Sequence, residues 1–315
     1  MTGTSSPDAT ILGAGIAGLS CARRLEALGL TVQVVDKSRG VGGRMATRRI
    51  GDATFDHGAQ FFTVRSDAFR DVVDQATAAG SVKVWCNGFD EPADGYPRFC
   101  GTQGMTSLAK WLAGELTGEV RLGETVVDLH ELPSRSYVLT APVPQSLAVL
   151  SFSRLLPPPP LAIEMAQIAY KPTIAVLITL AEPATGMPGH GGIQFADDPD
   201  LAFISDNSAK GISQTPALTI HLSNERSGAM WDATDENVVA AALDLASQHM
   251  DAPAVAATQV QRWRYAGPVE VHPDPAVVWG TEPVVALAGE AFAGPKVEGA
   301  FLSGLAAADA IAATL

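Results

Sequence analysis

The sequence of 315 residues has few cysteines, and those it has form no recognisable pattern. Cys21, Cys86 and Cys100 are far apart, odd in number and without the CxxC or Cys/His spacing of a metal site. Paired structural cysteines are typical of oxidising compartments. We therefore expect three thiols buried as small hydrophobic side chains, no metal site and a reducing compartment.

Basic residues are also scarce, because 21 Lys and Arg stand against 34 Asp and Glu, for a formal net charge of -13. Nucleic acids and anionic membranes are bound by clustered Lys and Arg side chains. The composition therefore argues against both as partners. A local basic patch can still bind a phosphate.

Long hydrophobic runs are missing as well. No uninterrupted apolar run approaches the ~18 to 20 residues of a membrane-spanning helix. The first ten residues, MTGTSSPDAT, have neither the basic nor the apolar region of a secretory signal. We expect a cytoplasmic protein. With 47% hydrophobic and 17% charged residues, the chain is long enough for one large globular domain or two interlocked ones.

A glycine-rich turn near the N-terminus gives the strongest positive signal. Strands are predicted at 10–13 and 31–35, and the apolar spacing predicts a helix over 17–28, so this segment reads as a βαβ unit. The turn inside it fits GxGxxG, in which the glycines permit a tight turn, close approach to a pyrophosphate and close helix packing. It consists of Gly13, Ala14, Gly15, Ile16, Ala17 and Gly18.

An acidic residue follows the second strand of this unit. Asp36, with Lys37 beside it, stands where a carboxylate can accept hydrogen bonds from a ribose diol. An NADP site would favour an arginine there. The segment therefore predicts a bound dinucleotide, either NAD or FAD.

The rest of the chain predicts an α/β protein with an inserted antiparallel sheet. Helices are expected at 106–116, 237–250 and 300–313, and strands at 120–129, 137–140, 173–182, 192–205, 217–223 and 284–288. The pattern at the end of the chain resembles that at the start. We expect a discontinuous cofactor domain of residues 1–68, 98–150 and 268–315, and a substrate domain of residues 69–97 and 151–267.

Four consecutive prolines, Pro157 to Pro160, interrupt the middle of the chain. Proline lacks an amide hydrogen and has a fixed φ angle, so we expect this run to be extended polyproline II that cannot lie within a helix. We interpret it as a stiff crossing between subdomains.

A second glycine motif decides between the two dinucleotides. Gly42 and Gly43, followed by Arg44, resemble the glycine doublet found after the second strand in FAD-dependent amine oxidases. Adjacent glycines let the loop pass close to the flavin nucleotide, and the arginine can meet the pyrophosphate or a carboxylate behind it. The resemblance therefore implies FAD, bound noncovalently, as the resident cofactor.

Further segments, in order and spacing, resemble the bacterial branch of the renalase family. They are FDHGAQFFT at 55–63, GMTSLA at 104–109, LTAPVPQ at 139–145, RWRYA at 262–266, AGE at 288–290 and VEGA at 297–300. The resemblance spans almost the whole chain and is weakest from 157 to 227. It implies a Rossmann-type FAD-binding domain like that of p-hydroxybenzoate hydroxylase, with an inserted α+β substrate domain.

The resemblance also implies which residues hold FAD. The GxGxxG turn and Asp36 would bind the ADP half, and a residue near Val127 would meet the adenine through its backbone. Glu290 stands where related flavoproteins often have an aspartate, and the final helix would direct its positive end at the flavin. The complete expected set is Gly13, Ala14, Gly15, Ile16, Ala17, Gly18, Asp36, Lys37, Gly42, Gly43, Arg44, Gln60, Val127, Gly289, Glu290, Val297, Gly299 and Ala300.

The candidate catalytic residues lie in two segments. His57 and Gln60 can present polar groups beside the flavin, although His57 can equally be a structural histidine. Arg262, Trp263, Arg264 and Tyr265 cannot all face one side of a strand, because successive side chains alternate. An arginine pair would suit a phosphate-bearing substrate, and an aromatic pair would suit a stacked ring. Lys296 can lie near the flavin or at the surface.

The resemblance implies an oxidase for the 2- or 6-dihydro isomers of NAD(P)H, with a small-molecule donor and O2 as partners and hydrogen peroxide as a product. Because flavin carries the redox chemistry, no nucleophilic triad is needed. Two alternatives remain open: an amine oxidase or desaturase, and a flavin-binding protein without turnover.

Overall fold

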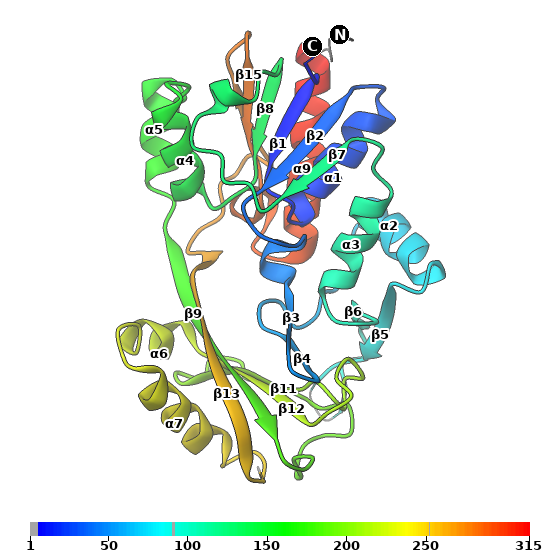
Figure 1. The fold of residues 1–315 in the computed structure, drawn as a ribbon, viewed down its shortest axis with the longest axis vertical. Coiled ribbons are helices and arrows are strands. Elements are labelled where there is room, and N and C mark those ends of the chain that lie inside the picture. Colours follow the sequence, from blue (N-terminus) through cyan, green and yellow to red (C-terminus); the bar gives the residue numbers. More distant parts are fainter. Residues whose placement is uncertain (1–5, 90–91, 252) are drawn as a thin grey trace.

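The computed structural model describes residues 6–89, 92–251 and 253–315. The larger of its two main sheets has the strand order β14-β15-β8-β1-β2-β7 (Figure 1). All neighbours are parallel except β14, which runs antiparallel to β15. The strands are β1 (Ala9–Leu12), β2 (Val32–Asp36), β7 (Glu119–Leu122), β8 (Ser136–Leu139), β14 (Val277–Trp279) and β15 (Val284–Leu287). Short apolar strands of this kind suit a parallel sheet that is covered on both faces.

Helices α1 (Ile16–Ala27) and α9 (Val297–Thr314) pack on one face of this sheet. They approach so closely that a β-carbon on Gly304 would lie 2.1 Å from the Ala17 carbonyl oxygen. Within the described residues, α9 is the one helix whose length and apolar composition would fit a membrane crossing. Its buried side chains pack in the core under the sheet, and that packing accounts for its composition.

The opposite face of the sheet is covered by α4 (Val143–Phe152) and α5 (Pro159–Ala166). The expectation that the four prolines exclude a helix is wrong, because Pro159 and Pro160 are the first two residues of α5. The first turn of a helix needs no amide hydrogen from these residues, and the fixed φ angle of proline suits it. The run therefore joins two helices on one face of the sheet, and the chain crosses to the second sheet only after α5 (Figure 1).

The second sheet is antiparallel, as expected, with the order β10-β11-β12-β9-β13. The long strands β9 and β13 run from the first sheet to the second (Figure 1). The strands are β9 (Tyr170–Leu180), β10 (Gly192–Gln194), β11 (Leu201–Asp206), β12 (Ala217–Leu222) and β13 (Val255–Pro268). The Rossmann-type first sheet and this antiparallel sheet confirm the predicted fold class.

The two faces of the second sheet have different partners. One face forms an apolar core with α7 (Asp235–Ala246), next to the short helix α6 (Asn224–Ala229). The other, which we call the inner face, packs Ala175 and Leu177 against Phe55 of β4 (Ala53–Asp56). Because side chains alternate along a strand, this division decides which residues of β11, β12 and β13 meet the rest of the molecule.

Smaller elements complete the fold. They are the short helices η1 (Gly43–Met45), η2 (Leu129–Glu131) and α8 (Glu290–Ala293), strands β3 (Thr47–Ile50), β5 (Val82–Cys86) and β6 (Arg98–Gly101), and helices α2 (Asp67–Ala78) and α3 (Thr106–Gly114). Helix α2 places Phe69, Val72 and Val73 in the core of the first sheet. The division of the chain into two domains by residue number stays a prediction.

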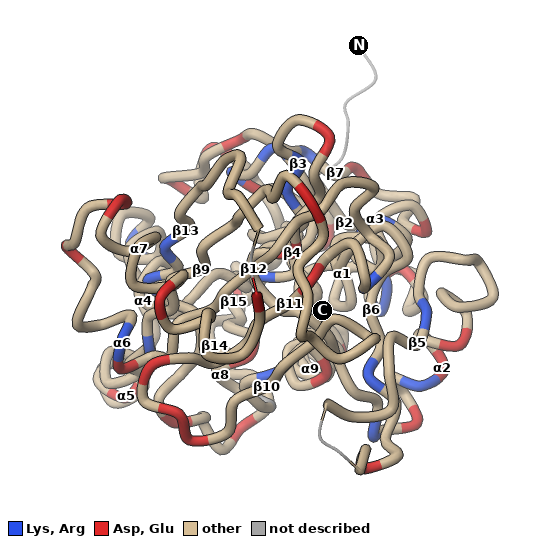
Figure 2. The backbone as a smooth tube through the Cα atoms, turned by 90° about the horizontal axis from the view of Figure 1, so that it is seen from below, with Lys and Arg blue, Asp and Glu red and all other residues tan. Residues whose placement is uncertain are grey.

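The burial of the cysteines and the distribution of charged residues can be compared with what the composition indicates. All three cysteines are unpaired; Cys21 and Cys100 are buried as expected, whereas Cys86 is partly exposed. Seen from below in Figure 2, acidic segments are spread around the periphery, and basic segments form only small groups among them, as near α2 and β5.

Candidate flavin site

The GxGxxG turn joins β1 to α1, and its three glycines have distinct surroundings. A β-carbon on Gly13 would lie 2.4 Å from the Thr140 hydroxyl, and one on Gly18 would lie 1.9 Å from the Gly13 carbonyl oxygen. A β-carbon on Gly15 would meet nothing within 4 Å. The first and third glycines therefore serve close packing, while the second opens the backbone to a ligand at the N-terminus of α1.

Asp36 stabilises this turn from the end of β2. One carboxylate oxygen accepts a hydrogen bond from the Ala14 amide at 2.7 Å, and the other accepts one from the Ser38 amide at 2.7 Å. A carboxylate has further lone pairs for a ribose diol. The neighbouring Lys37 points instead to Gln145, at 3.3 Å.

The glycine doublet lies directly beside the first turn. The Gly42 amide donates to the Ala14 carbonyl oxygen at 2.8 Å, and Gly15 and Gly42 form an isolated parallel bridge. Gly42 and Gly43 have φ angles of 112° and 54°, which favour glycine. The two glycine motifs are separate in the sequence but adjacent in space, and together they form one stretch of open backbone.

Arg44, which follows the doublet, pairs with a buried carboxylate. Both of its terminal nitrogens donate to the two carboxylate oxygens of Glu290, at the start of α8, and one also donates to the Tyr265 carbonyl oxygen at 3.1 Å. The structure shows the expected carboxylate partner for Arg44, and its contact with a pyrophosphate stays a prediction. Tyr170 lies beside this pair, and burial, followed by the charge of Glu290, raises the pKa of its hydroxyl.

The segment after β4 is attached to the same loop. A β-carbon on Gly58 would lie 2.0 Å from the Arg44 carbonyl oxygen, which also accepts a hydrogen bond from the Ala59 amide at 2.9 Å. The Gln60 side-chain amide donates to the carbonyl oxygens of Asp56, at 2.7 Å, and Gly58, at 3.1 Å. His57 and Gln60 are therefore buried next to the glycine doublet.

Strand β13 sorts its four candidate residues onto two sides. The Trp263 ring stacks on the His57 ring at 5.3 Å and 9°, and its indole nitrogen donates to the His57 carbonyl oxygen at 2.7 Å. The Tyr265 ring meets the Tyr170 ring edge-on at 5.4 Å. The aromatic pair therefore faces the glycine motifs.

The two arginines of β13 are not brought to this cluster. Arg262 pairs with Asp235 at the start of α7 and donates to the Trp231 and Ala233 carbonyl oxygens. The Arg264 guanidinium lies over the Trp231 ring at 5.3 Å. Both side chains thus serve the opposite side of the sheet, as alternation along a strand requires.

The remaining candidates lie where the chain returns to the first sheet. The Gly289 amide donates to the Ser303 hydroxyl at 2.8 Å. A β-carbon on Gly299 would lie 2.4 Å from the Gly294 carbonyl oxygen. Val297, Gly299 and Ala300 form the first turn of α9, whose N-terminal end carries a partial positive charge. Lys296, just before the helix, is exposed.

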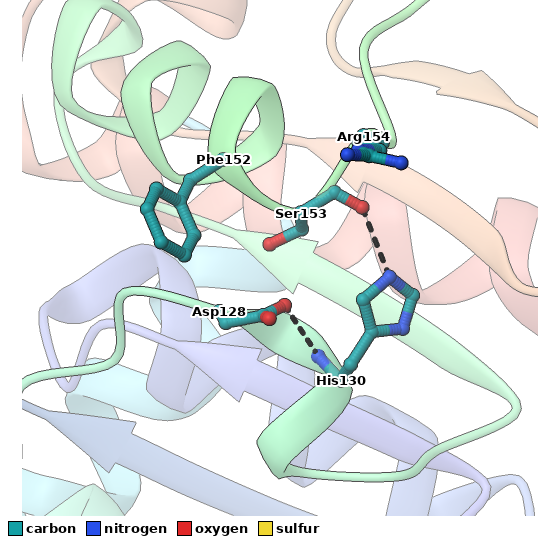
Figure 3. A pocket seen from close by; sticks show the side chains of 5 residues that line it. All are labelled: Asp128, His130, Phe152, Ser153 and Arg154. Carbon is teal, nitrogen blue, oxygen red and sulfur yellow. Dashed lines mark hydrogen bonds between the residues drawn. The ribbon is translucent and has the colours of Figure 1, made fainter.

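Val127 lies on the loop after β7 and is half exposed. Beyond it is a cavity of about 470 Å³, lined by residues of η2 and the end of α4 (Figure 3). One ring nitrogen of His130 lies 3.0 Å from the Ser153 carbonyl oxygen, and the His130 amide donates to Asp128 at 3.0 Å. None of the predicted site residues lines this cavity.

A buried ion pair that the sequence did not reveal supports the 56–61 segment. Lys210, in the turn between β11 and β12, donates to Asp56 at 2.7 Å and to the Gln60 carbonyl oxygen at 2.5 Å, and both charged side chains are fully buried. The other Asp56 carboxylate oxygen accepts from the Thr47 hydroxyl at 2.6 Å and the Met105 amide at 2.8 Å. The pair therefore links the second sheet to the loops around the glycine motifs.

Two histidines near this pair are uncharged at neutral pH. Burial, together with the charge of Arg48, lowers the pKa of His57 to about 4, against the opposing charge of Asp56. Burial also lowers the pKa of His221, on β12, to about 4, although a backbone hydrogen bond at His57 opposes the shift. Neutral imidazoles each offer one donor and one acceptor.

Two protein families together match most of the chain. Residues 11–76 match the NAD(P)-binding Rossmann-like domain, and residues 87–312 match the flavin containing amine oxidoreductase family. The chain belongs to the flavin containing amine oxidoreductases.

Solved structures agree with this flavin oxidoreductase fold. A putative protoporphyrinogen oxidase from Exiguobacterium sp. 255-15 has a TM-score of 0.73 at 14% identity, with 99% of this chain and 100% of that chain covered. Wild-type putrescine oxidase bound to putrescine has a TM-score of 0.69 at 15% identity, covering 98% and 99%. At such identities the likeness concerns the fold alone.

The residues of this flavin oxidoreductase fit FAD. The open backbone at Gly15 and the adjacent doublet suit a pyrophosphate, Asp36 suits a ribose, and the first turn of α9 suits the electron-rich end of a flavin. FAD is therefore the cofactor, and when bound it accepts electrons from a donor. The assignment of single residues to its parts stays a prediction.

We expect Lys210→Met to destabilise this oxidoreductase by about 3–5 kcal/mol, because it leaves the Asp56 carboxylate buried without its cation. Urea unfolding of the FAD-loaded protein measures the change. Lys83→Met is the matched control, since among the described residues Lys83 donates only to the Lys210 and Gly211 carbonyl oxygens of the same turn. Lys83→Met should lower the free energy of unfolding by about 1 kcal/mol. Equal losses of unfolding free energy in the two variants would contradict a stabilising role for the Asp56–Lys210 ion pair.

The two buried imidazoles make stability depend on pH. Their pKa values of about 4 lie below the ordinary value of 6.5, so between these pH values the unfolded chain binds more protons than the folded one. The contribution of the neutral imidazoles to the free energy of unfolding is fully present above pH 6.5. It is lost as the pH drops towards 4, by about 3 kcal/mol per imidazole. Unfolding free energies at pH 7 and pH 5 should differ less in His221→Gln than in the wild type. His249→Gln, at an exposed position, should leave that difference unchanged.

Proposed function

We propose that the protein is an FAD-dependent oxidase of renalase type. It takes a hydride from the 2- or 6-dihydro isomers of NAD(P)H, releases NAD(P)+ and passes the electrons to O2, which forms hydrogen peroxide. A cytoplasmic location belongs to the same proposal. The ordered renalase-like segments motivate it, and most of them lie around the candidate flavin site.

The aromatic side of β13 is the observation that carries the proposal. Trp263 stacks on His57 beside the glycine doublet, so the wall nearest the expected flavin is flat, aromatic and uncharged. A dihydropyridine ring is also flat and apolar on its faces, and it is already electron-rich. Such a donor needs no general base to give up a hydride.

Charge in the same region supports a neutral reacting group over a protonated amine. The Asp56 carboxylate is paired with Lys210, and the Glu290 carboxylate is paired with Arg44. Neither carries an uncompensated negative charge that would stabilise an ammonium group.

Amine oxidation is the second candidate. The fold likeness to putrescine oxidase favours it, and Tyr170 and Tyr265 form an aromatic pair near the site. These two rings meet edge-on at 79°, however, so they offer no parallel faces between which an amine nitrogen could lie.

Anaerobic mixing tests the proposal. The FAD-loaded protein is mixed with the 2-, 4- and 6-dihydro isomers of NADH and NADPH, and the loss of the visible flavin absorbance is followed over time. We expect rapid bleaching with the 2- or 6-isomer and slow bleaching with the ordinary 4-isomer. No rapid bleaching with either the 2- or the 6-isomer would refute the proposal, and peroxide formation from an amine panel would then support the second candidate.

Variants on the two sides of β13 sharpen this test. Trp263→Leu removes the stacking ring and should lower kcat/KM by about 5- to 100-fold, in line with the usual value of an aromatic stack. Arg264→Gln is its control on the other side of the sheet and should leave kcat/KM within about 2-fold, as expected for a residue that does not contact the donor.

A further inference from the structure

Buried polar atoms without partners gather at one place. Among the described residues, five buried side-chain polar atoms have no hydrogen-bond partner in the protein. Four of them belong to residues of the 56–61 segment or the inner face of the second sheet. These are His57 Nδ1, Gln60 Oε1, Ser205 Oγ and His221 Nε2, which we call the polar recess.

The strand register brings the members of the recess together. Ser205 on β11 lies opposite Thr219 on β12, and His221 is two residues further along β12, so all three share the inner face. The Thr219 hydroxyl donates to the Asp56 carbonyl oxygen at 3.0 Å, the same oxygen that accepts from the Gln60 side chain. Gln60 and strand β12, which carries His221, therefore meet at the Asp56 carbonyl oxygen.

Burying several polar atoms without hydrogen-bond partners in one region costs free energy unless a ligand supplies the missing partners. Buried polar atoms in folded proteins are nearly always hydrogen-bonded, and each one left alone loses its contacts with water without replacement. His57, Gln60, Ser205 and His221 are all at most 9% exposed. A ligand that supplies the missing partners would recover this free energy on binding.

The atoms define what the ligand must offer. Gln60 Oε1 can only accept a hydrogen bond, so the ligand needs a donor. The imidazoles and the Ser205 hydroxyl can each pair with a donor or an acceptor. The nearby Asp56 and Lys210 charges cancel each other, so this pair offers no counter-ion to a charged ligand.

We propose that the polar recess binds an uncharged amide group of the electron donor, with its N–H groups on Gln60 Oε1 and its carbonyl oxygen on the histidine and serine side. This rests on the proposed function, in which the donor carries a carboxamide on its ring. The stacked Trp263 and His57 rings form the adjacent wall for that ring. The pyrimidine edge of the flavin has the same amide chemistry, and the experiment separates the two sources.

Ligand discrimination tests the inference. The FAD-loaded protein is titrated with NAD+, with its 3-acetylpyridine analogue, which keeps the carbonyl but lacks the N–H donor, and with its nicotinic acid analogue, which is charged. Changes in flavin absorbance report binding. We expect NAD+ to bind about 10-fold more tightly than either analogue, as for the loss of a buried hydrogen bond.

Two variants and a matched control assign this preference to the recess. Ser205→Ala and His221→Leu should each reduce the preference for NAD+ to about 3-fold or less. Ser205→Ala should do so without lowering the thermal stability of the donor-free protein, because it removes only an unpartnered polar atom. Thr215→Val removes the fifth unpartnered atom, which lies outside the recess, and should keep the full preference.

Three results would overturn the inference. They are equal binding of all three dinucleotides, a preference unchanged in Ser205→Ala and His221→Leu, and a loss of FAD affinity in these variants with an unchanged preference, which would assign the recess to the flavin. The proposed function has its own readout: if dihydronicotinamide isomers still reduce the flavin rapidly, only the inference fails. If no isomer reduces it and no dinucleotide binds, both fail.

Discussion

The buried ion pair of Asp56 and Lys210 is the interaction on which the site depends. Its two charges come from separate parts of the chain, one at the end of β4 and one in the turn between β11 and β12. Lys210 also donates to the Gln60 carbonyl oxygen. The pair thus holds the 56–61 segment against the second sheet and cancels the charge of that region.

Glycine packing sets the other side of the site. Gly42 binds the turn that holds Gly15, and Gly58 has no room for a side chain against the Arg44 backbone. The expected flavin site and the 56–61 segment are therefore parts of one packed unit. Alternation along β13 then gives this unit an aromatic wall and leaves the arginines on the far side of the sheet.

Much of this arrangement could be predicted from local patterns. The GxGxxG turn and Asp36 depend on neighbours within one βαβ unit, and the alternation in β13 followed from its being a strand. Lys210 and His221 could not be predicted, because their roles depend on partners more than 150 residues away in the sequence. The only local signal for Lys210 was a lone lysine in a segment of small residues. The proline run was misread because a helix start tolerates what a helix interior excludes.

A crystal structure of the FAD-loaded protein tests the central claim most directly. The account predicts a flavin whose nucleotide part crosses the two glycine motifs and whose ring lies between the 57–60 segment and the Trp263 side of β13. A flavin ring placed against Arg262 and Arg264, or a nucleotide part away from Gly15 and Gly42, would contradict it.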